Sequence, residues 1–126
     1  MADKSLIGTE MGPGGFLIMS YVLVVLRASG NAGDEQHQAT AHERFIDSLI
    51  RRNLVLLGGG FAAPSYDSRA AYLLRCDGVE EARRITSEDP FVAHDVMRPE
   101  FLEWELVGIN PDAIEHEMIV RPSDVP

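Results

Sequence analysis

Hydrophobic residues along the chain gather in four short runs separated by polar or helical segments, a pattern typical of a sheet of four strands. The first run is the most apolar and is rich in Val, Ile and Leu, as strands are. The last run alternates, with Leu102, Trp104 and Leu106 on one face and Glu103 and Glu105 on the other, which predicts a half-exposed strand. The predicted strands are residues 17–27, 54–57, 70–76 and 101–107.

Two of the intervening segments have the spacing of amphipathic helices. In residues 35–53 the apolar positions recur three and four residues apart, which places them on one helix face. A second helix is expected to start at a cap on Asp77 or Gly78 and to stop before Pro90, whose ring cannot continue it. The order β-α-β-β-α-β predicts an α+β, ferredoxin-like fold with a four-stranded antiparallel sheet.

The chain is expected to contain one domain between two flanking segments. Residues 1–15 are rich in glycine and have no periodicity, so we expect a flexible leader. Residues 16–110 contain all the predicted strands and helices and form the domain, and residues 111–126 are expected to form an acidic C-terminal tail. A chain of 126 residues favours a single core, because two separate cores would each be too small to stand alone.

The first predicted strand suggests that the protein is a homodimer. Two helices can cover only one face of a four-stranded sheet. Residues 17–27 are nevertheless apolar on both faces, with Leu23 and Val25 on one side and Val22 and Val24 on the other. The face without helices would then expose a hydrophobic patch of the kind that marks an interaction surface. A second copy of the chain is the simplest cover for it, because most oligomers are symmetric dimers.

The composition limits the kinds of partner and the cellular compartment that we expect for the protein. The net charge is −9, from 11 Lys and Arg against 20 Asp and Glu, which argues against nucleic-acid binding because that requires cations. The longest apolar run, residues 16–26, is too short to span a bilayer, which takes about 20 residues, so no membrane partner is expected. The one cysteine, Cys76, cannot form an internal disulfide, and this fits a reducing cytoplasm.

His42 is the first candidate for chemistry. Phe45, Ile46 and Leu49 follow it at helical spacing, so its imidazole is expected on or beside the helix face that meets the sheet. Partial desolvation favours the neutral ring and leaves a base available near neutral pH. The alternative is a core histidine that donates a hydrogen bond to a backbone carbonyl.

Asp89 is the second candidate and also has two interpretations. It precedes Pro90, and an Asp N-cap followed by Pro at the first helical position is a common helix start. The same carboxylate could orient a histidine by accepting its Nδ1 proton. Both roles are compatible, because a carboxylate has about four lone-pair sites. His42 and Asp89 are far apart in sequence, so only the fold could bring them together.

Further candidates carry weaker signals. Gly59 and Gly60 follow a strand, where the lack of side chains would let a ligand approach the backbone, although a bulge or turn explains them equally well. His94 could line the same site as Asp89 or could lie on the surface. His42-Glu43 begins like a zinc-protease signature, but Ile46 stands where the second histidine is required. We therefore expect no metal and no cofactor.

Several of these segments together resemble one known family, the YciI-related (YCII) domain. They are Ala41-His42-Glu43-Arg44-Phe45, Leu56-Leu57-Gly58-Gly59-Gly60, Val79-Glu80-Glu81-Ala82, Asp89-Pro90-Phe91-Val92 and Glu103-Trp104, and they lie within residues 19–108. The resemblance implies a ferredoxin-like fold, a dimeric α+β barrel and a His–Asp pair in a cleft, at the positions of His42 and Asp89. One branch of the family removes hydrogen chloride from a chlorinated hydroxyquinol. The chain departs from the family pattern at Gly59-Gly60 and at His94, which leaves the substrate open.

Two functions from different classes follow. The leading hypothesis is a small cofactor-independent enzyme in which His42, oriented by Asp89, abstracts a proton from a small cyclic or aromatic molecule and so drives elimination or isomerisation. The alternative is a non-catalytic dimeric module that binds a small ligand or a partner protein. An oxygen-using monooxygenase would share the same dimeric barrel, but no particular residue here supports it.

Overall fold

The centre of the structure is one long strand, β2 (Leu17–Ala28), which has an antiparallel neighbour on each side. In this computed structural model, which describes residues 9–11, 17–63, 66–115 and 120–125, the other main strands are β3 (Val55–Gly60), β4 (Ser68–Leu74) and β5 (Met97–Leu106). Their order across the sheet is β3-β4-β2-β5, and all pairs are antiparallel. The helices are α1 (Glu35–Arg51), α2 (Val79–Thr86) and the short α3 (Pro90–Ala93).

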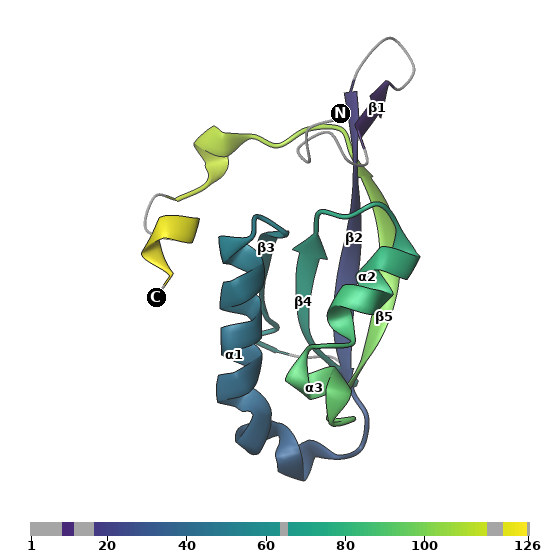
Figure 1. The fold of residues 1–126 in the computed structure, drawn as a ribbon, viewed down its shortest axis with the longest axis vertical. Helices are drawn as coiled ribbons and strands as arrows, with labels where there is room; N and C mark the ends of the chain where they lie inside the picture. The colour runs from purple at the N-terminus through teal and green to yellow at the C-terminus, as the bar shows by residue number, and fades with distance from the viewer. Residues whose placement is uncertain (1–8, 12–16, 64–65, 116–119, 126) are drawn as a thin grey trace.

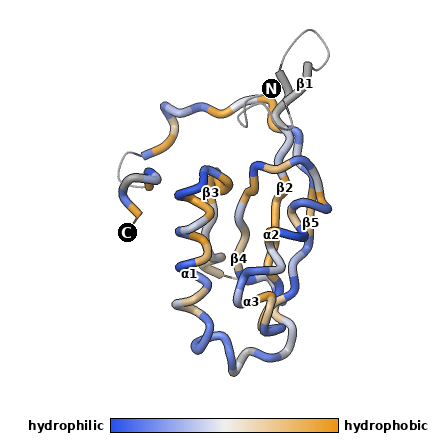
Figure 2. Tube along the Cα trace, viewed as in Figure 1, coloured by the Kyte–Doolittle hydropathy of each residue, from blue (hydrophilic) through white to orange (hydrophobic). Residues whose placement is uncertain are grey.

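All three helices lie on one side of the sheet, as Figure 1 shows. The predicted β-α-β-β-α-β order and the four-stranded antiparallel α+β fold are confirmed, with α3 as a short addition between α2 and β5. Because strand side chains alternate between faces, Val22, Val24 and Leu26 of β2 point to the helices and form the main core with α1, α2 and α3. Figure 2 shows how hydrophobic residues continue along β2.

The helix that carries His42 ends in a well-defined cap. Asn53 has a positive φ of 59°, the left-handed conformation that Asn tolerates better than most residues. Its N–H donates to the Ile50 carbonyl, and the Leu54 N–H donates to the Leu49 carbonyl. These two bonds make a Schellman motif, which satisfies carbonyls at the helix end and turns the chain directly into β3.

Two strands are longer than the sequence pattern predicts. β3 continues through Gly58, Gly59 and Gly60 instead of stopping before them, because their backbones pair with β4 across from Tyr72, Ala71 and Ala70. β5 begins at Met97, ahead of the predicted start at Phe101, and it includes Pro99. A proline is tolerated there because β5 is an edge strand.

A bulge in β3 decides which of its residues face the helices. Val55 pairs with Leu74, but Leu57, and not Leu56, pairs with Leu73, so one extra residue is inserted into β3. Gly58 consequently lies opposite Tyr72, on the helix side of the sheet. The two backbones approach so closely there that a Cβ on Gly58 would lie 2.8 Å from the Tyr72 Cβ.

The two segments that the sequence predicts to flank the domain contain short regular elements. Within the expected leader, Thr9–Met11 form a short strand, β1, that pairs with the start of β2; the remainder of that segment lies outside the described residues. In the tail the described parts include two short 3-10 turns, η4 (Pro111–Ala113) and η6 (Pro122–Asp124). Among the described residues, no helix combines the length and apolar character needed to cross a membrane.

The face of the sheet without helices is also largely apolar. Tyr21, Leu73 and Leu106 are buried there in a second, smaller cluster with Leu23 beside them. In β5 the apolar side of the alternation is the side that points away from the helices, because Trp104 and Leu102 pair with Tyr21 and Leu23 of β2. Leu102 and Trp104 each remain 48% exposed. The second apolar face predicted from β2 therefore extends over the neighbouring strand.

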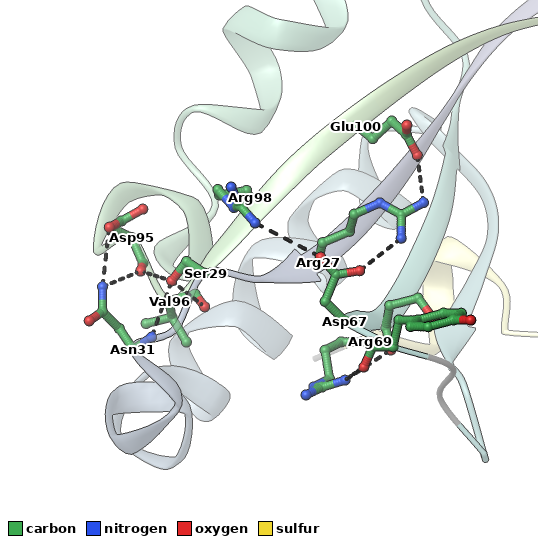
Figure 3. A network of polar contacts seen from close by, with 11 residues as sticks. Arg27, Ser29, Asn31, Asp67, Arg69, Asp95, Val96, Arg98 and Glu100 are labelled. Atoms are coloured by element: carbon green, nitrogen blue, oxygen red, sulfur yellow. Dashed lines mark hydrogen bonds and ion pairs between the residues drawn. The ribbon is translucent and has the colours of Figure 1, made fainter.

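One end of this face is charged, and the charges are paired. Arg27 donates to Asp67 at 3.0 Å and to Glu100 at 2.8 Å, and Arg98 lies 3.9 Å from Asp67, as Figure 3 shows. Because these groups are substantially exposed, each pair contributes little stability on its own. Their effect is to confine the apolar part of the face to the other end.

A second polar network ties the loop between β2 and α1 to the loop before β5. The Ser29 hydroxyl donates to the carbonyls of Asp95 and Val96 (Figure 3). The Asn31 side chain donates to the Asp95 carbonyl at 2.9 Å and to its carboxylate at 3.1 Å. Asp95 itself has a positive φ of 54°. These bonds join the chain ahead of the His42 helix to the chain that follows Asp89.

The close approach at Gly58 predicts a stability difference between two adjacent glycines. Gly58→Ala should unfold with a free energy about 1–3 kcal/mol lower than Gly59→Ala, because the added methyl collides with Tyr72. A Cβ on Gly59 has nothing within 4 Å, and both substitutions reduce unfolded-state entropy equally. Equilibrium unfolding in urea measures the difference, and equal stabilities would contradict the described packing.

Candidate active site

The fold brings His42 and Asp89 into direct contact. The His42 Nδ1 lies 2.8 Å from Asp89 Oδ1, although the two residues are 47 positions apart in the chain. His42 comes from the middle of α1, and Asp89 stands immediately before α3, which packs beside α1. The contact is a side-chain pair and not the histidine-to-carbonyl bond of the alternative interpretation.

The imidazole is held in one orientation. It is stacked on the Phe91 ring, with ring centroids 4.2 Å apart and planes inclined by 21°. Because an ionised carboxylate only accepts hydrogen bonds, we assign the shared proton to the His42 Nδ1; in the neutral form of the ring, Nε2 then carries the lone pair. Among the described residues, Nε2 has no hydrogen-bond partner, and 16% of the side chain is exposed. The ring therefore has a fixed tautomer and a free basic nitrogen.

Asp89 is completely buried, and its carboxylate makes three contacts. Oδ1 accepts from the Phe91 backbone N–H at 3.0 Å in addition to His42, and Oδ2 accepts from the Tyr72 hydroxyl at 3.3 Å. Asp89 is therefore the N-cap of α3, with Pro90 at the first helical position, and at the same time the partner of a histidine. Both interpretations of the sequence apply to the same residue. A buried carboxylate is tolerable only because each oxygen has a donor.

Tyr72 and Thr86 belong to the same network and were not among the site residues predicted from the sequence. The Tyr72 hydroxyl lies 3.5 Å from Thr86 Oγ1 as well as 3.3 Å from Asp89. Burial, followed by the charge of Asp89, raises the pKa of the Tyr72 phenol, so it remains a hydrogen-bond donor at neutral pH. The available clue was that Tyr72 lies on the core side of its strand, where a phenol needs a polar partner.

The other predicted contacts lie outside this network. His94 caps the end of α3 through its backbone, and its exposed side chain makes no hydrogen bond or ion pair within the described part of the chain. Gly59 and Gly60 lie on the exposed edge strand next to Gly58. No described contact joins these three residues to His42 or Asp89, so their role as substrate contacts stays a prediction.

The described residues contain no cluster of three or more His, Cys, Asp or Glu side chains that could hold a metal ion. The chemistry that the site itself offers is proton transfer. A neutral imidazole oriented by a carboxylate can accept a proton at Nε2, and the carboxylate then stabilises the imidazolium that forms. Phe91 limits the ring's freedom to turn away.

Comparison with known proteins supports the architecture. No family model and no curated protein matches the sequence. One similar solved structure is the 5-chloro-2-hydroxyhydroquinone dehydrochlorinase TftG from Burkholderia phenoliruptrix AC1100, in complex with 2,5-dihydroxybenzoquinone. The match has a TM-score of 0.54 and covers 68% of this chain and 93% of that chain. The two proteins share a fold. At 13% sequence identity the likeness extends to the fold alone.

The pairing of His42 with Asp89 predicts which tautomer the neutral imidazole adopts. The ring proton should reside on Nδ1 in the unmodified protein, and this preference should weaken in Asp89→Asn, because a neutral amide oxygen attracts the proton less than a carboxylate does. The asparagine can still accept from the Phe91 N–H, so α3 keeps its cap. The nitrogen chemical shifts of the ring, measured by NMR, distinguish the two tautomers. The exposed Asp77→Asn serves as the control, and the same tautomer preference in both variants would show that Asp89 does not set it.

Proposed function

We propose that the protein is a cofactor-independent enzyme of the YCII-related group that uses His42 as a general base on a small cyclic or aromatic molecule. The observation that carries the proposal is the 2.8 Å contact between His42 Nδ1 and the buried Asp89 carboxylate. This contact leaves Nε2 as the basic atom, as general-base catalysis requires. The sequence motifs that resemble the YCII domain include both residues.

The proposed step is an elimination or an isomerisation. Nε2 of His42 takes a proton from a carbon or hydroxyl group of the substrate, and the electron pair left behind forms a new double bond. In an elimination, the leaving group departs with the electrons of its own bond; chloride would do so in a dehydrochlorination. In an isomerisation, the imidazolium returns the proton at another carbon. Neither reaction changes the overall oxidation level, so neither calls for an external oxidant or reductant.

The fold comparison supports the substrate class. The similar structure, TftG, is a dehydrochlorinase named for a chlorinated hydroxyhydroquinone, and it was solved with 2,5-dihydroxybenzoquinone. Both molecules are small, cyclic and oxygenated. A substrate of that class has acidic hydroxyl groups that a single positioned imidazole can deprotonate, and so it fits the chemistry that His42 and Asp89 offer.

The substrate contacts are proposed to be Gly59, Gly60 and His94. A Cβ on Gly59 would meet nothing within 4 Å, and one on Gly60 would come no closer than 3.8 Å, so the edge strand leaves room for a ligand beside its backbone. His94 ends the helix that Asp89 begins, and its exposed imidazole could bind a substrate oxygen or supply a second acid or base.

The working form is proposed to be a homodimer that buries the face of the sheet without helices. Leu57, Leu102 and Trp104 are 60%, 48% and 48% exposed on that face, and the paired charges lie at its other end. Partly exposed large apolar side chains grouped on one face are typical of an interaction surface. A two-fold axis would place the same patch of each copy against the other.

The proposed location is the cytoplasm. Cys76 is buried in the main core and unpaired, and burial raises the pKa of its thiol, which keeps it protonated and unreactive. A reduced, packed cysteine of this kind is typical of proteins from a reducing compartment.

Replacement of the base should slow the reaction greatly and leave the protein folded. With 5-chloro-2-hydroxyhydroquinone as probe in anaerobic buffer, His42→Ala should release chloride about 10²- to 10⁴-fold more slowly than the unmodified protein. His37→Ala, an exposed histidine on the same helix, should release it at the normal rate. Chloride measured against time gives both rates.

Two results would count against this assignment. Full turnover by His42→Ala would show that the imidazole is not the base. Binding of the probe without chloride release or rearrangement by the unmodified protein, together with a lower melting temperature and unchanged affinity for His42→Ala, would favour the non-catalytic binding module.

The proposed interface predicts a change of mass on one substitution. Sedimentation velocity should show the unmodified protein as a dimer and Trp104→Glu as a monomer, because the charge would be buried without a partner between the two sheets. Tyr66→Glu is the control, since Tyr66 is 99% exposed and lies outside the strands. A dimeric Trp104→Glu would place the interface elsewhere.

A further inference from the structure

The two oxygens of the Asp89 carboxylate have different partners. Oδ1 lies 2.8 Å from His42 Nδ1 and 3.0 Å from the Phe91 backbone nitrogen. Oδ2, on the side away from His42, has one partner among the described residues, the Tyr72 hydroxyl at 3.3 Å. Among the described residues, Oδ2 is therefore held by one side chain from the sheet, whereas Oδ1 is held from α1 and α3.

The Tyr72 hydroxyl donates its proton to Asp89. The residue is only 3% exposed, and its hydroxyl has one proton to give. The ionised carboxylate can only accept, so this proton goes to Oδ2, while Thr86 Oγ1 lies 3.5 Å away and can donate to the phenol oxygen. Desolvation raises the pKa of the phenol, which keeps the proton in place. Among the described residues, Asp89 is the one charged group within hydrogen-bond distance of this phenol.

The backbone of Tyr72 can approach β3 closely because its pairing partner, Gly58, has no side chain. Gly58 pairs with Tyr72 across β3 and β4, and a Cβ on Gly58 would lie 2.8 Å from the Tyr72 Cβ and 3.2 Å from its Cα. Gly59 and Gly60 pair with Ala71 and Ala70 and have no such restriction. Of the three consecutive glycines, the one required by packing is therefore the one next to the residue that holds Asp89.

We infer that Tyr72 is a positioning residue for the catalytic pair: it holds the Asp89 carboxylate toward His42 from the far side, and Gly58 gives it the space to do so. The inference rests on the proposed function of the pair, which it deepens. Without this hydroxyl, Oδ2 would have no donor among the described residues, and the carboxylate would lose the contact that opposes its rotation away from His42.

The test is NMR of the His42 Nδ1–H proton in Tyr72→Phe, which removes the hydroxyl and keeps the ring. This proton should exchange with solvent several-fold faster than in the unmodified protein, because the carboxylate that accepts it is no longer held from the far side. Tyr21→Phe, a buried tyrosine on the opposite face of the same sheet, should leave the exchange rate unchanged. Faster exchange in Tyr72→Phe alone supports the inference. An unchanged or slower rate in the folded variant overturns it, whatever happens to the melting temperature.

A second pair of variants tests the role of Gly58 without removing the phenol. Gly58→Ala should displace Tyr72 and speed the exchange of the His42 Nδ1 proton, whereas Gly59→Ala should not. Equal exchange rates in these two variants would overturn the part of the inference that concerns Gly58, and they also decide the matter if Tyr72→Phe fails to fold. None of these measurements depends on turnover. Loss of the proposed function would instead appear as absent chloride release with the differences in exchange intact.

Discussion

A buried carboxylate is the constraint around which the rest of the molecule is arranged. Removing a charged group from water is unfavourable unless hydrogen bonds replace its hydration. Asp89 obtains them from three different places: a side chain of α1, the backbone of α3 and a side chain of β4. Helices and sheet must therefore meet in one geometry for the carboxylate to be satisfied at all. The same geometry fixes the tautomer of His42.

This arrangement joins stability to chemistry at one residue. As the N-cap of α3, Asp89 accepts from the Phe91 N–H, and the ring of that same residue supports the imidazole of His42. A base that relies on both the carboxylate and the aromatic ring is held from its edge and from its face. Such double restraint is how a site built from few residues achieves the orientation that proton transfer needs.

The sequence was most informative where periodicity is strong. The order of strands and helices, the apolar second face of β2 and the cap before α3 all follow from spacing and residue type, and the structure has them. β3 and β5 were longer than predicted for a different reason. Glycines and Pro99 disfavour strands locally, but backbone pairing to β4 and β2 outweighs these preferences at the sheet edges.

The site likewise contains residues that the sequence pattern predicts and residues that it does not. His42 could be placed beside the core from its helical neighbours, and its pairing with Asp89 came from the family resemblance, since no local signal spans 47 residues. Tyr72 and Thr86 could not be predicted as site residues, because each has the pattern of an ordinary core position along the chain. Their importance arises only when strand pairing and helix packing bring three separate segments together.

The extra residue in β3 determines which residue of this exposed edge strand lies opposite Tyr72. If Leu56 were paired in regular fashion, the ladder would slip by one position and Leu57 would replace Gly58 opposite Tyr72. An isobutyl group would then occupy the space where the two backbones now nearly touch. A related chain lacking this irregularity would need its glycine one position earlier. An insertion or deletion in β3 would therefore change the residue opposite Tyr72, and through Tyr72 it would affect the buried Asp89 carboxylate.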